Sequence, residues 1–323
     1  MVSVVIKKKI TSNNIPPPAI IKMEIILLGA NGQVGWELQR SLATLGKVKA
    51  CDRLEANLEN LDKIRTLVQV HRPEVIVNAA AYTAVDLSES EHEKAYQINA
   101  KAVAVLADEA KRINSWLIHY STEYVFDGTK KDAYVETDET NPQSIYGKSK
   151  LKGENGIKKS GCKYLIFRTS WVYSTHGSNF PKHMIRLAKE QSQLKVVDDQ
   201  VGAPTSAELI ADVTSLCLHR IAQNDTSAQN MIGTYHITPA GETSRHGYTK
   251  FIITEMQRLG SKFRTVSENI VPISTSEYPQ PAMRPSNSQL DTQKLRETFN
   301  IYLPPWQFHV RRLIKELHTQ ESG

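Results

Sequence analysis

Residues 24–35 read Glu24-Ile25-Ile26-Leu27-Leu28-Gly29-Ala30-Asn31-Gly32-Gln33-Val34-Gly35, and this stretch decides the fold. Its apolar first half predicts a buried parallel strand, and the apolar residues that follow recur at helical spacing. A strand, a glycine turn and a helix start bind pyrophosphate, because backbone N–H groups and the helix dipole point at the anion. We therefore predict a dinucleotide site at Gly29, Gly32, Gln33, Val34 and Gly35.

An aspartate, Asp52, follows the second predicted strand (residues 47–51), about twenty residues beyond the glycine loop. An acid at this distance is placed to bind a ribose hydroxyl of the dinucleotide. The glycines are spaced G-x-x-G-x-x-G, whereas the ordinary fingerprint is G-x-G-x-x-G. The alternative is a glycine-rich turn beside an ordinary loop aspartate, and the order of the elements favours the dinucleotide site.

The remainder of the first half of the chain also alternates between predicted strands and predicted helices. We expect helices over residues 59–70 and 91–112, and strands over 75–80, 116–120 and 164–167. Repeated strand–helix units build a parallel sheet that is covered on both faces. Ligands of such sheets bind beyond the carboxyl ends of the strands, which here fall at Gly29, Asp52, Ala80, Thr122 and Thr169.

Tyr146 and Lys150 lie four residues apart in a predicted helix, so both side chains reach the same cleft. A phenol with a pKa near ~10 exchanges protons poorly at neutral pH. A nearby ammonium favours the phenolate, so we expect Lys150 to lower the pKa of Tyr146. Such a pair alone is weak evidence, but a glycine loop upstream on the same chain makes it strong.

The sequence predicts an α/β protein with a Rossmann-like doubly wound parallel sheet and a smaller C-terminal α/β lobe that binds substrate. We expect the dinucleotide domain over residues 23–171, with later segments returning to it, and mainly the substrate lobe over 172–323. Residues 1–22 contain a run of three prolines, and we expect a disordered or non-native extension there.

Composition excludes several classes of function. The net charge is +6, but the four lysines of residues 1–22 account for most of it, which argues against nucleic-acid binding. No apolar run approaches the ~20 residues that a membrane span needs. The cysteines Cys51, Cys162 and Cys217 are scattered, as in a reduced cytoplasmic protein, and their spacing matches no zinc site.

Several motifs together resemble the extended short-chain dehydrogenase/reductases. They are Gly29 to Leu38, Val77 to Ala81, His119 to Phe126 and Tyr146 to Leu151. Further runs narrow the resemblance to the dTDP-4-dehydrorhamnose reductase family: Phe167 to Tyr173, Asp199 to Thr205 and Arg284 to Ser288. The resemblance extends from about Met23 to Glu316.

The resemblance implies a reductase that uses NADPH or NADH to reduce the C4 keto group of the sugar nucleotide dTDP-4-dehydro-L-rhamnose. Tyr146 would donate the proton, Lys150 would hold the nicotinamide ribose, and Thr122 would bind the carbonyl oxygen. Glu123, Trp171 and Arg284 would contact the substrate; Glu123 stands where the family has an aspartate. A capping role for Thr122 and a core role for Trp171 are the alternatives.

For the cofactor, the resemblance adds contacts at Asn57, Leu58, Ala80 and Ala81. Asp52 favours NADH because it would repel a 2′-phosphate, whereas the adjacent Arg53 would attract one, so the choice stays open. Asn99 matches the asparagine that supports the catalytic lysine through a water, and a purely structural role is its alternative.

The resemblance also implies a homodimer and a structural Mg2+ held between glutamates where two chains meet. Glu208 and Glu316 match those glutamates, although two surface glutamates are ordinarily just solvated. Two other functions compete with the leading one. They are reduction of another 4-keto-6-deoxy sugar nucleotide, and a regulatory subunit like the beta subunit of methionine adenosyltransferase. Intact Thr122, Tyr146 and Lys150 favour an enzyme.

Overall fold

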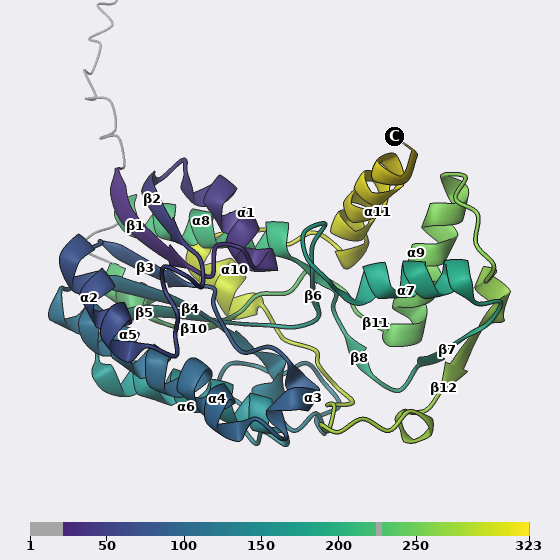
Figure 1. Ribbon diagram of the computed structural model, residues 1–323, viewed down its shortest axis with the longest axis horizontal. Helices are drawn as coiled ribbons and strands as arrows, with labels where there is room; N and C mark the ends of the chain where they lie inside the picture. Colours follow the sequence, from purple (N-terminus) through teal and green to yellow (C-terminus); the bar gives the residue numbers. More distant parts are fainter. Residues whose placement is uncertain (1–21, 224–227, 323) are drawn as a thin grey trace, which may run out of the picture.

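The computed structural model describes residues 22–223 and 228–322, which form a large lobe and a smaller one (Figure 1). The predicted extension therefore falls, apart from Lys22, outside the described residues. Within the described part of the chain, no helix is long and apolar enough to cross a membrane.

The large lobe is built on a six-stranded parallel sheet, as predicted. Its order is β10 (Gly233–His236), β5 (Lys163–Thr169), β4 (Trp116–Thr122), β3 (Val75–Asn78), β1 (Met23–Leu28) and β2 (Gly46–Cys51). The chain moves outward from β1 to β2 and then returns to place β3 on the other side of β1. The direction of winding thus reverses between β1 and β3, where doubly wound sheets bind their ligands.

Helices cover both faces of this sheet (Figure 1). One face packs against α1 (Gln33–Leu42), α8 (Ala207–Gln223) and α10 (Gln293–Phe299). The other packs against α2 (Leu61–His71), α5 (Ala102–Arg112) and α6 (Ile145–Ser160). Because α8, β10 and α10 all follow residue 171, the chain returns to the first lobe after entering the second.

The small lobe has its own apolar core, formed mainly by α7 (Phe180–Glu190), α9 (Arg245–Arg258) and α11 (Trp306–Ser322). Three short strand pairs complete it: β7 (Leu194–Val197) with β12 (Ile270–Ile273), β8 (Val201–Gly202) with β11 (Thr243–Ser244), and β6 (Val172–Tyr173) with β9 (Thr205–Ser206). Short helical turns η4 (Ser267–Asn269) and η5 (Thr275–Glu277) lie on either side of β12, whereas α3 (Val85–Ser88), η2 (Glu123–Val125) and η3 (Ala228–Met231) belong to the connections of the large lobe.

The segment predicted as one helix over residues 91–112 is divided. It comprises α4 (His92–Tyr96), a π-helical turn η1 (Gln97–Lys101) and α5. Single π turns inside helices occur frequently at functional sites. This one carries Asn99, whose side chain is buried beside α6. Hydrophobic periodicity does not reveal a π turn, because the turn shifts the helical register of the apolar residues by only one residue.

Candidate active site

The glycine loop has the backbone geometry that a pyrophosphate site requires. Gly29 has a φ of +79°, and a Cβ there would lie 2.6 Å from the Ala80 nitrogen. A Cβ on Gly35 would lie 2.0 Å from the Gly29 carbonyl oxygen, so the first helical turn packs directly on the loop. No side chain caps α1, whose N-cap is the exposed Gly32. Its first N–H groups therefore face outward with the partial positive charge that attracts an anion.

Beside this loop lie the residues predicted to hold the rest of the dinucleotide. Asp52 follows β2, and its Oδ1 accepts the backbone N–H groups of Leu54 at 2.8 Å and Glu55 at 3.1 Å. The carboxylate therefore closes a turn and still presents its second oxygen. Arg53 is paired with Glu59 at 2.8 Å, so its charge is already partly satisfied.

Four other predicted cofactor contacts surround the same edge of the sheet. Ala80 and Ala81 are half-buried at the end of β3. Leu58 is buried in the core beneath the sheet, and the Asn57 side chain accepts the N–H of Glu59 at 3.0 Å. Leu58 thus supports the site from below, while Asn57 shapes the adjoining turn.

A loop of the small lobe lies over the glycine loop. The His176 ring stacks on the Trp36 ring, with centroids 4.6 Å apart and planes 7° apart. His176 Nε2 lies 3.0 Å from the Asn31 carbonyl oxygen, and Asn179 donates to the Gln33 side chain at 2.9 Å. Trp36 is 51% exposed and belongs to this contact between lobes, not to the core.

Three predicted site residues meet beyond the end of β4. The Thr122 hydroxyl donates to the Glu123 carboxylate at 2.8 Å, and both residues are buried. The Thr122 hydroxyl also acts on the Tyr146 phenol, whose pKa it lowers, although burial outweighs this effect. Burial raises the pKa of Glu123 to about 7, although the Arg245 charge opposes this shift.

The relation between Lys150 and Tyr146 differs from our expectation. Burial raises the pKa of Tyr146 above its ordinary value, and the Glu123 charge raises it further. Lys150 does not lower it, because its Nζ turns the other way: it donates to the Tyr120 carbonyl oxygen at 2.5 Å and lies 3.3 Å from His119 Nε2. The lysine is 2% exposed, and burial lowers its pKa to about 8.

The helix that carries this pair is fixed to the sheet by a buried ion pair. Glu154, one turn after Lys150, receives two hydrogen bonds from Arg168 of β5, at 2.9 and 2.7 Å. It also accepts the hydroxyl of Ser121 at 2.6 Å. Since Ser121 precedes Thr122, this one carboxylate sets the distance between α6 and the end of β4.

Asn99 has a structural task in this arrangement. Its side chain accepts the Tyr82 N–H at 2.9 Å, and donates to the Tyr82 carbonyl at 3.0 Å and to Ser149 at 3.0 Å. A Cβ on Gly153 of α6 would lie 2.2 Å from the Asn99 carbonyl oxygen. The π turn and α6 therefore touch backbone to backbone, beside Ser149 and Lys150.

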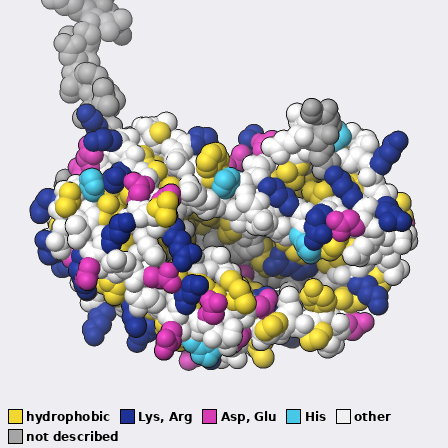
Figure 2. Space-filling model, viewed as in Figure 1, with side chains coloured by type: hydrophobic (Ala, Val, Ile, Leu, Met, Phe, Trp, Pro, Cys, Tyr) yellow, Lys and Arg dark blue, Asp and Glu magenta, His cyan; other side chains and the backbone are white. Residues whose placement is uncertain are grey.

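Trp171 lies where the two lobes join, and Figure 2 shows the surface hollowed between the lobes. Its φ of 48° is in the left-handed region, a strained conformation for a bulky residue that is typical of functional sites. A Cβ on Gly202 would lie 2.9 Å from its ring, so only glycine leaves room for the indole.

Arg245 was not predicted from the sequence. The first residue of α9, it places its guanidinium carbon 3.7 Å from the centre of the Trp171 ring and 5.0 Å from that of Phe180. Its guanidinium has no hydrogen-bonded partner among the described residues, although its charge acts on Glu123 and Tyr124. The residues that Arg245 contacts are distant from it in sequence, and the sequence around Arg245 contains no motif that would have indicated it.

Arg284 approaches the same region from another loop. It donates to Asp86 at 2.6 Å and to Gln280 at 3.0 Å, and its guanidinium carbon is 5.9 Å from the centre of the Tyr124 ring. Two guanidinium groups thus flank Tyr124, and only one of them is paired with a carboxylate.

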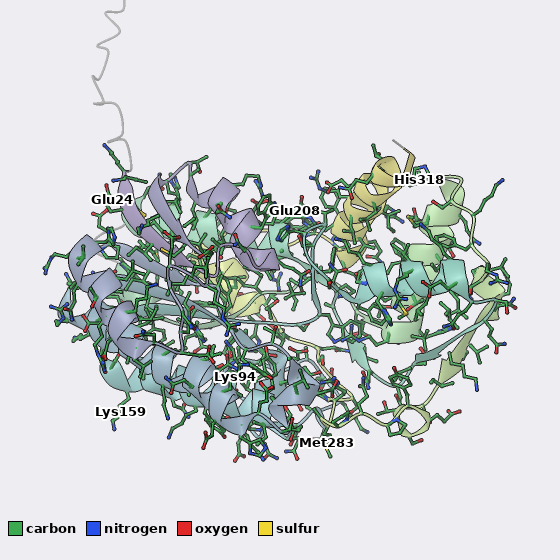
Figure 3. The ribbon with its side chains drawn as sticks, viewed as in Figure 1. Glu24, Lys94, Lys159, Glu208, Met283 and His318 are labelled. Carbon is green, nitrogen blue, oxygen red and sulfur yellow. The ribbon has the colours of Figure 1, made fainter. Side chains whose placement is uncertain are left out.

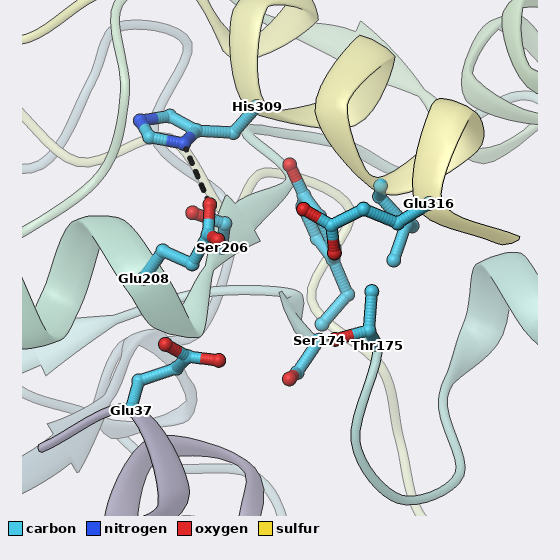
Figure 4. A pocket seen from close by; sticks show the side chains of 9 residues that line it. Glu37, Ser174, Thr175, Ser206, Glu208, His309 and Glu316 are labelled. Atoms are coloured by element: carbon cyan, nitrogen blue, oxygen red, sulfur yellow. Dashed lines mark ion pairs between the residues drawn. The ribbon is translucent and has the colours of Figure 1, made fainter. Parts of the chain in front are cut away.

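Glu208 and Glu316 do not belong to this cleft. They line a separate pocket together with Glu37 of α1 (Figure 4), and Figure 3 shows Glu208 between the two lobes. Glu208 lies 3.5 Å from His309 and 3.2 Å from Arg312, which also approaches Glu316 at 3.7 Å. Within the described residues, no three His, Cys, Asp or Glu side chains are placed to hold a metal ion. A Mg2+ shared between two chains stays a prediction.

Fold and site together define a class of protein. The extended short-chain dehydrogenase/reductases combine three features found here. They have a doubly wound parallel sheet, a glycine loop at its switch point, and a threonine after β4 with a tyrosine and a lysine on α6. A lobe built on the C-terminal half closes the cleft over these residues.

Comparisons with known proteins narrow this class. Residues 23–319 match the family model for the RmlD substrate binding domain. The dTDP-4-dehydrorhamnose reductase of Burkholderia thailandensis is 46% identical over 92% of this chain and 100% of that one, and that of Salmonella typhimurium is 45% identical over 92% and 99%. The chain belongs to the dTDP-4-dehydrorhamnose reductase family.

Solved structures of the same family superpose closely. The Clostridium acetobutylicum reductase is 37% identical, with a TM-score of 0.81 over 91% of this chain and 99% of that one. The Bacillus anthracis enzyme is 34% identical, with a TM-score of 0.81 and the same coverage, and was solved in complex with NADP.

Proposed function

We propose that the protein reduces the C4 keto group of dTDP-4-dehydro-β-L-rhamnose to give dTDP-L-rhamnose. The observation that carries the proposal is that Tyr146, one helical turn from Lys150, packs its ring 5.5 Å from that of Tyr124, whose backbone N–H donates to the Thr122 hydroxyl at 3.2 Å. A bound reduced nicotinamide supplies the hydride. Family membership supports the sugar nucleotide as substrate, and the Bacillus anthracis complex supports NADP as a cofactor.

In this reaction the chain's own residues hold the ketone and supply the proton. The Thr122 hydroxyl and the Tyr146 phenol both donate to the ketone oxygen, which becomes an alkoxide as hydride arrives. Tyr146 then gives its proton to that oxygen. Its raised pKa keeps the phenol protonated until negative charge develops on the substrate, which suits a proton donor.

Arg245 and Arg284 support a substrate that carries a diphosphate. The cleft around Tyr124 holds two guanidinium groups, and Arg245 has donors to spare among the described residues. A diphosphate brings two negative charges and several acceptor oxygens, which match planar guanidinium groups. Trp171 holds the Arg245 guanidinium in place through its stacked ring.

The test is the absorbance of reduced nicotinamide, followed with the protein, NADPH or NADH, and freshly made dTDP-4-dehydro-L-rhamnose. We expect oxidation that needs both protein and sugar nucleotide, and a loss of about 100-fold or more in Tyr146→Phe. This variant should still bind the cofactor, because only the transferable proton is lost. Near-normal turnover in Tyr146→Phe would reject the tyrosine as the donor.

Other outcomes select among the alternatives. No oxidation of either cofactor, in a protein that still binds dinucleotide, would favour another 4-keto-6-deoxy sugar nucleotide. Failure with a panel of those would favour the regulatory subunit. A homodimer and a bridging Mg2+ at Glu208 and Glu316 remain part of this proposal, and sedimentation with Mg2+ or with EDTA tests both.

A further inference from the structure

A chain of buried polar side chains runs behind Lys150. Asn78 of β3, His119 of β4 and Lys150 of α6 are 1%, 0% and 2% exposed. Asn78 Nδ2 lies 3.1 Å from His119 Nδ1, and His119 Nε2 lies 3.3 Å from Lys150 Nζ. The function proposed above uses Lys150 but leaves His119 and Asn78 without a task.

The orientation of Asn78 follows from a backbone group. The N–H of Ala80 donates to the Asn78 side chain at 3.2 Å. A backbone N–H is only a donor, so the atom that it meets must be the amide oxygen. The amide NH2 of Asn78 therefore faces His119.

This orientation selects one form of the histidine. Since the NH2 group of Asn78 donates, His119 Nδ1 must accept and carries no proton. Burial and the Lys150 charge hold the pKa of His119 well below its ordinary value, so the ring is neutral. A neutral ring without a proton on Nδ1 has its proton on Nε2, the atom that faces Lys150.

The Nε2–H group of His119 then faces Lys150 Nζ, which is itself a hydrogen-bond donor when the lysine is charged. An ammonium has three N–H donors and no acceptor, so two donors would point at each other across 3.3 Å. A neutral amine resolves the conflict, because its lone pair accepts from Nε2–H while one of its N–H groups still donates to the Tyr120 carbonyl.

We propose that His119, oriented by Asn78, is a positioning residue that donates a hydrogen bond to the neutral amine of Lys150 and so makes the lysine a stronger acid. The inference rests on the proposed reductase function. After Tyr146 gives its proton to the substrate oxygen, the Lys150 ammonium supplies a proton that reaches the phenolate through intervening water, because Nζ does not contact the phenol, and the lysine becomes an amine. His119 stabilises that amine and neither gains nor loses a proton, and water later protonates the lysine again.

The charges around Lys150 fit this assignment. Burial lowers the pKa of Lys150 to about 8, and Glu154 on the same helix is the acid that opposes this shift. Tyr146 lies one turn away on α6, and Glu123, which titrates near 7, lies beyond the end of β4. From the β4 side, His119 approaches Lys150 within hydrogen-bond distance, with its Nε2 3.3 Å from Nζ.

The direct test is the tautomer of His119, read from 15N–1H NMR correlations of the histidine rings in the full chain. The His119 signal is assigned by its loss in His119→Phe. We expect a neutral ring with the proton on Nε2. In Asn78→Asp, the carboxylate only accepts, so we expect the proton to move to Nδ1. A wild-type ring with its proton on Nδ1 would overturn the proposal. This measurement needs no substrate, so its outcome is independent of whether the sugar nucleotide is correctly named.

The second test is the pH profile of kcat, in which turnover falls as Lys150 loses its proton. Removing the Nε2–H donor in His119→Phe should raise the pKa of Lys150, moving this alkaline limb up by about one pH unit. Asn78→Asp should move it in the same direction. A merely structural role would lower kcat without moving the limb, and that result in both variants would also overturn the proposal.

Discussion

At the scale of single residues, the chemistry of the site depends on which acceptor receives the hydroxyl proton of Thr122. Thr122 has a single hydroxyl proton, and it points at the Glu123 carboxylate. While Glu123 is ionised, that proton is not available to a substrate carbonyl. Glu123 stands where the family resemblance led us to expect an aspartate, whose side chain is one methylene shorter.

We therefore expect kcat/KM to rise as the pH falls through about 7. Burial raises the pKa of Glu123 to about 7, and its protonation below this value releases the Thr122 hydroxyl. Glu123→Gln removes the titrating group, so the inflection near 7 should disappear from its profile. An unchanged inflection in Glu123→Gln would assign the titration to another group.

Arg245 gives a second prediction at this scale. Arg245→Ala should raise the KM for the sugar nucleotide by about 10-fold or more, the effect of losing a hydrogen bond to a charged group. The Arg245 charge also opposes the rise in the pKa of Glu123, so the inflection near 7 should move to higher pH. Arg245→Lys is the matched control, because it keeps the charge but loses the planar fork. Unchanged KM values in both variants would place the diphosphate elsewhere.

The sequence predicted some of these residues and not others, for a physical reason. Tyr146 and Lys150 share a helix face, so local spacing indicated them, whereas the role of Thr122 was implied by the family resemblance. The expected lowering of the Tyr146 pKa by Lys150 is not seen, because the Lys150 Nζ contacts the Tyr120 carbonyl and His119 of another element. Arg245 was not predicted because its place in the site depends on stacking against the Trp171 ring, a contact that local sequence does not indicate.

At the scale of elements, α6 matters most, because it carries Tyr146 and Lys150 and is held by one buried carboxylate. Glu154 and Arg168 are 0% and 1% exposed, and Arg168 makes both of its bonds to Glu154. Strand and helix positions were predicted closely, since apolar periodicity determines them. The π turn η1 was not, and it lies where the Asn99 backbone closely approaches Gly153 of α6, a contact between residues distant in sequence.

We expect Glu154→Gln to destabilise the protein by about 3–5 kcal/mol, because it leaves the charge of Arg168 buried without a partner. Urea unfolding, followed by circular dichroism, measures this loss. Glu190→Gln is the matched control: it breaks the Arg186–Glu190 pair of α7, whose side chains are 58% and 52% exposed, and should cost less than about 1 kcal/mol. Equal losses in the two variants would contradict a special role for Glu154.

At the scale of the whole molecule, two lobes with separate cores meet along the cleft. The parallel sheet was predicted because strands and helices alternate along the first half of the chain. The C-terminal lobe was predicted because this regular alternation gives way to shorter elements and loops in the second half. The contacts between lobes were beyond sequence reasoning, since they join surfaces that no periodicity connects. One of these contacts is the group of Glu208 on α8 with His309 and Arg312 on α11.

This contact should make stability depend on pH. His309 and Arg312 lower the pKa of Glu208 from its ordinary 4.5 to about 2. A depressed pKa in the folded state gives stability that is complete above 4.5 and lost as the pH falls toward 2. We expect Glu208→Gln to lose up to about 1 kcal/mol at pH 6, since Arg312 is half exposed, and to differ less from wild type at pH 3. A difference that stays constant between these pH values would contradict the assignment.

The stacked rings of Trp36 and His176 give the protein an optical property of its own. A protonated imidazole in contact with an indole quenches its fluorescence, and here the two rings come from different lobes. Of the four tryptophans, Trp116 and Trp306 are buried, whereas Trp36 is 51% exposed and emits at longer wavelength than buried indoles. Separation of the lobes over the glycine loop would therefore brighten the red edge of the emission, so that the native chain reports its own opening and closing without an added dye.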